Sequence, residues 1–260
     1  MRTAIFSDVH GNLTALEAVL ADIRQQAPDL IFFAGDLCLS GARPSACLQR
    51  LRQENISSIY GNTDEEISKR PLLSDDIEAE KQARLEEVDD IVGWTMAQLT
   101  ERERAWLREL PFFRRVSPTP NPRDDIFIVH ANPHDVTRHI HPPEEQQKTL
   151  YGEIKQADDD VGLSHLLYDL ETGILAFGHV HVPSIRHWSD LTLANISSVS
   201  LPLDGDPRAK YGLFTWQNGQ WSITHQYVTY DIQAEVEQLS RIQPPDWKEI
   251  SQQLQAAQSN

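Results

Sequence analysis

Apolar runs that alternate with helical patterns constrain the fold of this chain more than any other feature of its sequence. Short apolar runs end near Phe6, within 30–36 and within 56–62, and each has the length of a single strand. Residues 13–26 carry apolar side chains at helical spacing, and a second helix is expected near 44–53. This order of strands and helices predicts a doubly wound α/β core with a parallel sheet. Ligands bind such sheets beyond the carboxyl ends of the strands, so polar residues there are candidates for function.

The rest of the chain predicts further strands and an insertion. Residues 64–111 are highly charged and helical in pattern, which predicts a cap-like helical insertion whose charged face is solvated rather than a moving gate. Apolar runs at 126–132 and 174–178 predict two more buried strands. Residues 185–228 alternate in strand fashion, and we expect them to form a second sheet behind the first. We expect a single domain over residues 1–260.

Charge and composition exclude several classes of protein. The formal net charge of −16 repels polyanions, so we expect no binding of long nucleic acid, whereas small phosphorylated substrates stay possible near a local cationic centre. The two cysteines, Cys38 and Cys47, are too few for a zinc cluster or a disulfide framework. The sequence predicts neither a signal peptide nor a membrane span. We therefore expect a cytoplasmic protein without membrane partners, and the sequence does not indicate its oligomeric state.

Polar residues that can bind metals follow each of the five apolar runs. One such residue is more often a helix N-cap or a hydrogen-bonded core histidine, but this many together on one crevice rim could not be desolvated without a cation. Their number suggests two metal ions, which can share a bridging carboxylate, and Asp36 is the candidate for that bridge. The seven predicted metal ligands are Asp8, His10, Asp36, Asn62, His130, His179 and His181.

These residues lie in motifs that resemble a known family. The segments "SDVHGN", "GD", "GNTD", "VHAN" and "GHVH" are similar, in order and spacing, to the five blocks of the calcineurin-like metallophosphoesterase superfamily. Residues 194–214 are similar to a segment of its small bacterial phosphodiesterase branch. The resemblance implies an α/β fold, a four-layer α/β/β/α sandwich of two packed mixed sheets flanked by helices. It also implies that one metal is held by Asp8, His10, Asp36 and His181, and the other by Asp36, Asn62, His130 and His179.

The implied activity is hydrolysis of phosphodiester or phosphomonoester bonds in small substrates. Two divalent cations, manganese above all and otherwise iron, zinc, cobalt or nickel, would generate a bridging hydroxide that attacks phosphorus directly. Many members have a histidine where this chain has Thr63, and threonine cannot protonate a leaving group comparably. His134 is the first candidate for a substitute acid. Asp64 is expected to orient a neighbouring ligand or to cap a helix, with the two roles equally weighted. The residues expected to serve catalysis are thus Asp36, Asn62, Asp64 and His134.

Three other functions stay open from the sequence. A diadenosine tetraphosphate hydrolase or a protein phosphatase shares the five blocks, although these relatives usually keep the histidine that Thr63 replaces. A non-catalytic interaction scaffold shares the fold, but a scaffold has no reason to keep all seven ligand types. The sequence thus favours an enzyme and leaves its physiological substrate and native metals undetermined.

The change at Thr63 generates the first prediction. We expect Thr63→His to raise turnover of alkyl phosphate esters more than that of aryl esters, because only a strongly basic leaving group needs protonation. Steady-state turnover on a matched pair of alkyl and aryl esters measures the difference. An equal change on both esters would contradict the argument.

Overall fold

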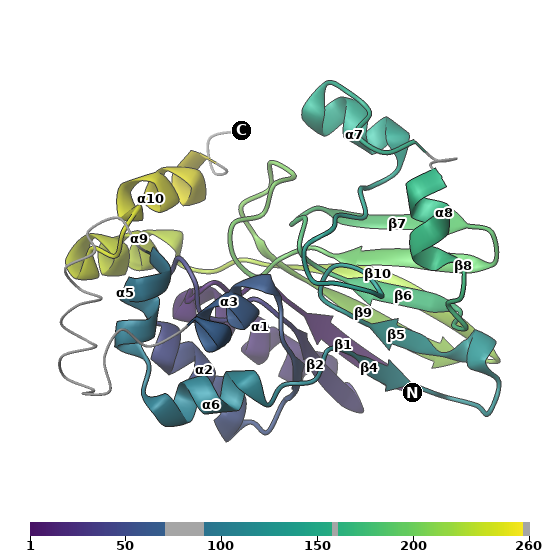
Figure 1. The fold of residues 1–260 in the computed structure, drawn as a ribbon, viewed down its shortest axis with the longest axis horizontal. Coiled ribbons are helices and arrows are strands. Elements are labelled where there is room, and N and C mark those ends of the chain that lie inside the picture. The colour runs from purple at the N-terminus through teal and green to yellow at the C-terminus, as the bar shows by residue number, and fades with distance from the viewer. Residues whose placement is uncertain (71–90, 158–160, 257–260) are drawn as a thin grey trace.

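Two sheets form the centre of the molecule. The computed structural model describes residues 1–70, 91–157 and 161–256, and within these ranges it contains two five-stranded sheets (Figure 1). The first sheet has the order β10 (Gln220–Val228), β9 (Ala209–Gln217), β1 (Arg2–Phe6), β2 (Leu30–Ala34) and β3 (Ser57–Ile59). The second has the order β4 (Arg114–Val116), β5 (Ile126–Ile128), β6 (Ile174–Phe177), β8 (Leu191–Ile196) and β7 (Pro183–Trp188).

Helices cover the outer faces of both sheets. The side of the first sheet carries α1 (Leu13–Gln26), α2 (Pro44–Gln53), α3 (Asn62–Lys69), α5 (Ile91–Gln98), α6 (Glu101–Arg108), α9 (Ile232–Ile242) and α10 (Trp247–Ala256) (Figure 1). The side of the second sheet carries α7 (Glu144–Tyr151) and α8 (Val161–Leu167), and a short 3₁₀ turn, η1 (Pro122–Asp124), precedes β5. Among the described helices, none combines the length and the apolar character needed to cross a bilayer.

Three apolar clusters separate the four layers. Side chains alternate along each strand, so Ala4 and Phe6 face the helices of the first sheet while Ile5 lies in the cluster between the sheets. The second sheet behaves likewise: Ile126 and Ile128 face the first sheet. Phe127 faces α8. The predicted four-layer α/β/β/α sandwich of two mixed sheets is confirmed.

The last four strands do not form a sheet of their own, and this part of the prediction was wrong. β7 and β8 join the second sheet beside β6, whereas β9 joins the first sheet antiparallel to β1 and carries β10 at its outer edge. β9 can lie centrally because both of its faces are apolar: Tyr211 and Leu213 pack towards the helices, and Phe214 packs between the sheets. Both sheets are therefore mixed, with parallel strands at their centres.

The predicted insertion over 64–111 is helical where the structure describes it. Ile67 of α3, Val92 of α5 and Leu107 of α6 are buried in the cluster that covers the first sheet. The described helices of this segment therefore belong to the outer helical layer. Residues 71–90 of the predicted insertion lie outside the described residues, and the role of the segment as a cap stays a prediction.

The cluster between the sheets should dominate stability, since it fixes how the two sheets meet. Ile128 is fully buried there, two residues before His130, so we expect Ile128→Ala to lower the free energy of unfolding by about 2–5 kcal/mol. Ile185→Ala is a control in the same sheet, where the side chain is 38% exposed and the loss should stay under about 1 kcal/mol. Urea denaturation measures both values. Equal losses for the two variants would contradict the assignment.

Candidate metal centre

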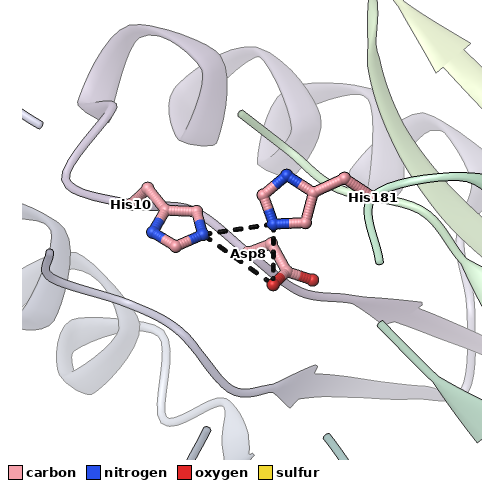
Figure 2. A group of neighbouring side chains, drawn as sticks. All are labelled: Asp8, His10 and His181. Carbon is pink, nitrogen blue, oxygen red and sulfur yellow. Dashed lines mark hydrogen bonds and ion pairs between the residues drawn. The ribbon is translucent and has the colours of Figure 1, made fainter. Parts of the chain in front are cut away.

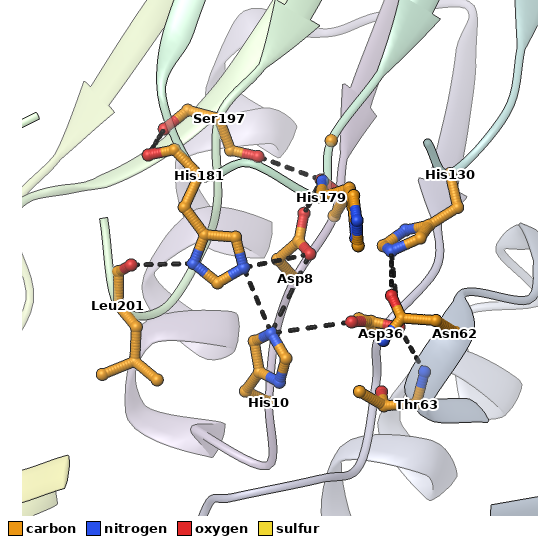
Figure 3. A network of polar contacts seen from close by, with 12 residues as sticks. Asp8, His10, Asp36, Asn62, Thr63, His130, His179, His181, Ser197 and Leu201 are labelled. Carbon is orange, nitrogen blue, oxygen red and sulfur yellow. Dashed lines mark hydrogen bonds and ion pairs between the residues drawn. The ribbon is translucent and has the colours of Figure 1, made fainter. Parts of the chain in front are cut away.

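The seven predicted ligands meet where the carboxyl ends of the two sheets converge. The loop after β1 carries Asp8 and His10, the loop after β2 carries Asp36, and the first residue of α3 after β3 is Asn62. The second sheet contributes His130 after β5, and His179 and His181 after β6. Figure 3 shows these side chains pointing towards one another from both sheets. Residues up to 173 positions apart in the sequence thus form one cluster, as the strand-end argument predicts.

Asp8, His10 and His181 form the first group of donors (Figure 2). Their ligand atoms all lie within 4.8 Å of one another. The Nε2 atom of His181 lies 3.2 Å from Oδ1 of Asp8, and the Nε2 atom of His10 lies 3.8 Å from that oxygen. Three donor atoms from two loops therefore face one point.

The imidazoles of this group are oriented to bind a cation. The Nδ1–H of His10 donates to the carbonyl of Leu39 at 3.2 Å, and the Nδ1–H of His181 donates to the carbonyl of Leu201 at 2.8 Å. In the neutral rings the Nε2 atoms then carry lone pairs, and these two atoms lie only 3.3 Å apart. Facing lone pairs repel each other unless a cation lies between them. The donor chemistry therefore fits a metal ion.

A second group of donors consists of Asp8, Asp36 and His130. The Nδ1–H of His130 donates to the carbonyl of Ala34 at 2.9 Å, which leaves Nε2 to face Oδ1 of Asp36 at 3.5 Å. The other oxygen of Asp36, Oδ2, lies 3.8 Å from Nε2 of His10 in the first group. Asp36 thus directs one oxygen to each group, while Asp8 belongs to both.

Asn62 and His179 complete the cluster on the side of His130. The Oδ1 atom of Asn62 lies 3.0 Å from Nε2 of His130. The ring of His179 lies edge-on to that of His130 at 5.0 Å, and its Nε2–H donates to the carbonyl of Thr137 at 2.9 Å. The Nδ1 atom of His179 then carries the lone pair of the neutral ring. The position of these donors supports a role as ligands, which stays a prediction.

The buried charge of Asp8 shows why the cluster needs cations. Asp8 is fully buried, and its Oδ1 has no hydrogen-bond partner among the described residues. Its Oδ2 accepts from Oγ–H of Ser7 at 2.5 Å and from the backbone N–H of His179 at 3.1 Å. Burial raises the pKa of Asp8, but the charges of His181, His130 and His10 outweigh burial and lower this pKa well below its usual range. A carboxylate held ionised with one bare oxygen is suited to metal binding.

The histidines show the reciprocal effect. Burial lowers the pKa of His181 and of His130, yet the carboxylates of Asp8 and Asp36 outweigh burial and raise both. For His10, burial prevails and its pKa is lowered. The carboxylates of the cluster therefore attract positive charge to the same point from several sides.

Asp64 lies behind the ligands and fixes the backbone that carries them. Its carboxylate accepts three backbone N–H groups, from Asp36 at 2.8 Å, from Leu37 at 3.0 Å and from Gly61 at 3.0 Å. Burial and then the charge of Asp36 raise the pKa of Asp64 to about 7 against these donors. The contact with Gly61 also caps α3, so the geometry combines the two roles that the sequence left open.

Two glycines allow the loops to approach this closely. A Cβ atom on Gly61 would lie 2.2 Å from Oδ1 of Asp36, and one on Gly178 would lie 2.4 Å from Oδ2 of Asp8. Neither oxygen could retreat without leaving the cluster. Glycine is therefore required at both positions, because any side chain would collide with a ligand oxygen.

Strained backbone conformations aim the ligands inwards. Five of the seven predicted ligands have left-handed φ angles, a conformation that costs non-glycine residues about 1–3 kcal/mol each at most sites. Such strain persists only where the surrounding structure fixes it, and it is concentrated at functional sites. The five angles are 56° at Asp8, 46° at His10, 64° at Asp36, 67° at His179 and 56° at His181.

Some residues singled out in the sequence lie elsewhere. His134 donates from Nε2 to the carbonyl of Leu166 in α8 at 3.1 Å, so its position does not support the predicted role of acid. The histidine of that loop that lies beside the cluster is His139, whose ring is 4.7 Å from that of His179. Thr63 donates its backbone N–H to Oδ1 of Asp36 at 3.0 Å, and its buried hydroxyl has no partner among the described residues.

Several supporting residues were missed. Asn195, fully buried at the end of β8, donates to the carbonyl of Gly178 at 2.6 Å and accepts from the N–H of Ser197 at 2.8 Å. Ser197 in turn donates to the carbonyl of His181 at 3.3 Å. Both residues lie in the segment 194–214 that carries the family resemblance, which was the available signal. The backbone carbonyls that orient the imidazoles leave no signal in a sequence.

Comparisons with known proteins agree with this geometry. The sequence profile of the calcineurin-like phosphoesterase superfamily domain matches residues 1–219. The chain is 28% identical over 249 residues to the uncharacterized protein MJ0912 of Methanocaldococcus jannaschii, with 94% of each chain covered. Its fold is similar to that of a metallophosphoesterase from Sphaerobacter thermophilus, with a TM-score of 0.74, 26% identity and 99% of each chain covered. It also resembles the hypothetical protein PH1004 of Pyrococcus horikoshii, with a TM-score of 0.72, 17% identity and 97% of each chain covered.

Substitution of Asp64 tests whether its hydrogen bonds to the backbone position the metal ligands. We expect Asp64→Asn to weaken metal binding by about 10–100-fold, because an amide nitrogen cannot accept the N–H groups that hold Asp36 and Gly61. Titration of the metal-free protein with manganese measures the affinity. Glu66→Gln is the control, since Glu66 is exposed on the same helix and its change should leave the affinity unaltered. Unchanged affinity in Asp64→Asn would refute the positioning role.

Proposed function

The chain belongs to the calcineurin-like phosphoesterase superfamily, and from this premise we propose that it is a dinuclear metal-dependent phosphoesterase. It hydrolyses phosphodiester or phosphomonoester bonds in small phosphorylated substrates. The observation that carries the proposal is the pair of donor groups that share Asp8, with Asp36 directing one oxygen to each. One cation needs three or four protein ligands, so two donor groups that share Asp8, with Asn62 and His179 beside the second group, support two cations.

Different residues of the cluster have different roles in metal binding and catalysis. When bound, divalent cations supply Lewis acidity, which acidifies water and offsets negative charge on phosphoryl oxygens. Asp8 and Asp36 provide the negative charge that holds the cations, and the carbonyls of Leu39, Leu201 and Ala34 keep the imidazoles turned inwards. Asn62 is a neutral donor and half-buried, which leaves that side of the cluster open to a substrate. Carboxylate, imidazole and amide donors suit manganese, iron, zinc, cobalt or nickel, and we propose manganese first.

Direct attack on phosphorus accounts for the lack of a covalent nucleophile in the motifs. The cysteine nearest to the ligands, Cys38, is fully buried, and burial raises its pKa well above the usual value. Its Sγ faces the carbonyl of Pro44 at 3.8 Å, which is consistent with a structural thiol.

The leaving group is the second element of the proposal. Thr63 offers no proton comparable to that of an imidazole, and His134 is bonded to Leu166. The enzyme should therefore favour esters whose leaving group is a weak base, such as aryl phosphates and phosphoanhydrides. Arg208 is not proposed to bind the phosphate, because its guanidinium is paired with both oxygens of Asp206.

An interaction scaffold of the same fold explains the site less well. A scaffold needs neither inward-facing lone pairs nor five strained ligand residues, and both features cost stability. Hydrolysis of bis-p-nitrophenyl phosphate or p-nitrophenyl phosphate by the purified protein with manganese tests the proposal. Absence of both metal binding and hydrolysis would favour the scaffold.

Substitution of Asp36 is the most direct test of whether the site binds two cations. We expect Asp36→Asn to lose both cations and to lower turnover of bis-p-nitrophenyl phosphate by at least about 100-fold, because the residue directs an oxygen to each donor group. Metal content by emission spectrometry and turnover are measured on the same samples. Asp246→Asn, an exposed aspartate outside the cluster, is the control that should keep both. Retained turnover with two bound cations in Asp36→Asn would refute the shared role.

A further inference from the structure

A cavity borders the metal centre on the side of His130 and His179. Its volume is about 310 Å³, at the lower end of small-ligand pockets, so it can take one ring system. It lies between the edge of the first sheet, the start of α3 and the loop after β5. Its lining consists of Tyr60, Glu65, Phe112, His134, Asp135, Val136 and Thr137.

Two residues that line this cavity, Thr137 and Tyr60, lie next to predicted metal ligands. Thr137 lines the cavity, and its carbonyl accepts from Nε2–H of His179 at 2.9 Å. Tyr60 lies two residues before Asn62, whose amide oxygen is 3.0 Å from Nε2 of His130. The cavity therefore lies beside the part of the cluster that His179 and Asn62 form.

Aromatic walls define what the cavity can bind. The rings of Tyr60 and Phe112 are 6.0 Å apart between centroids and tilted by 54°, and both are half-buried. Val136, 4% exposed, adds an aliphatic surface. Half-exposed aromatic faces in a cavity of this size favour a flat, unsaturated ring that stacks on one of them.

Carboxylates in the lining add a second requirement. Asp135 accepts through Oδ1 from the backbone N–H of Thr137 at 2.8 Å and of Arg138 at 2.7 Å, which keeps it ionised, while its Oδ2 has no hydrogen-bond partner among the described residues. Glu65 is paired with Lys69, which is largely exposed to solvent, so this pair is weak. The cavity therefore accepts N–H donors and repels any phosphate group that would enter it.

We propose that this cavity binds the nucleobase of a nucleotide substrate while a phosphate of the same molecule lies at the metal centre. The proposal rests on the proposed function and names its substrate class. Adenine, guanine and cytosine have the required chemistry, since each combines a flat ring with an exocyclic amino group that donates to a carboxylate. A phosphoserine or phosphothreonine peptide fits poorly, because its phosphorylated side chain offers no ring to stack on Tyr60 or Phe112.

Binding of adenosine monophosphate and of ribose 5-phosphate separates the base from the phosphate. Equilibrium dialysis of non-hydrolysable phosphonate analogues of the two molecules against the manganese-loaded protein measures both affinities without turnover, and inhibition of bis-p-nitrophenyl phosphate hydrolysis by the two phosphates measures them in the working enzyme. We expect adenosine monophosphate to bind roughly tenfold more tightly, as one stacked base allows. Tyr60→Leu should reduce this ratio to about two or less, and Tyr60→Phe should keep it. Tyr168→Leu changes an exposed tyrosine outside the cavity and should also keep the ratio.

A second pair of nucleotides tests whether the carboxylates of the cavity contribute to binding. Cytidine monophosphate carries the exocyclic amine that uridine monophosphate lacks, so the wild type should bind it more tightly, and Glu65→Gln should narrow the difference. Lys69→Gln breaks the same ion pair but keeps the carboxylate, and should preserve the difference. Equal binding of adenosine monophosphate and ribose 5-phosphate by the wild type would overturn the inference, as would an unchanged ratio in a folded Tyr60→Leu variant. Failure to hydrolyse the nitrophenyl ester would instead count against the proposed function, because dialysis still reports on the cavity.

Discussion

Two buried carboxylates, Asp8 and Asp36, impose the constraint to which the rest of the structure responds. Both carboxylates are buried where the carboxyl ends of two sheets meet, and a buried charge is tolerated only when opposite charge or hydrogen-bond donors surround it. Among the residues that the structure describes, imidazoles rather than lysine or arginine face these carboxylates. A backbone carbonyl bonds Nδ1–H of each of these imidazoles, so in the neutral ring the lone pair of Nε2 faces the carboxylates. The compensation is therefore left to cations, which explains why carboxylates and lone pairs converge.

The four-layer fold keeps the ligand residues together although their charges and lone pairs repel one another. Left-handed backbone at the ligand residues and close contacts at glycines are unfavourable locally, so the apolar clusters on both faces of each sheet must keep the loops in place. Asp64 and Asn195 extend that support into the loops through hydrogen bonds to backbone groups. The parallel strands at the centre of both sheets bring these loops to one edge. Rigid support of this kind lets a site keep charges and strain that would unfold a less constrained loop.

Charge on the whole chain and charge at the site have opposite consequences for a phosphorylated substrate. A net charge of −16 repels anions at long range, so binding depends on the local field of the metal centre. A neutral part of the substrate can add binding affinity, because the negative charge of the protein does not repel it. The proposed stacking of a nucleobase on Tyr60 or Phe112 is of this kind, and the carboxylates of the cavity repel phosphate groups from the cavity itself.

The sequence by itself determined the α/β class, the strand-end positions of the seven ligand candidates and the family, because buried strands followed by polar residues and short motifs are local patterns. Only the tertiary structure decided that β9 pairs with β1, that Asp8 belongs to both donor groups and that His139 rather than His134 lies beside the cluster. These features depend on strand pairing and on loop conformations whose partners lie far away in the chain. A backbone carbonyl such as that of Leu201 has the same chemistry at every residue, so no sequence pattern reveals which one orients an imidazole.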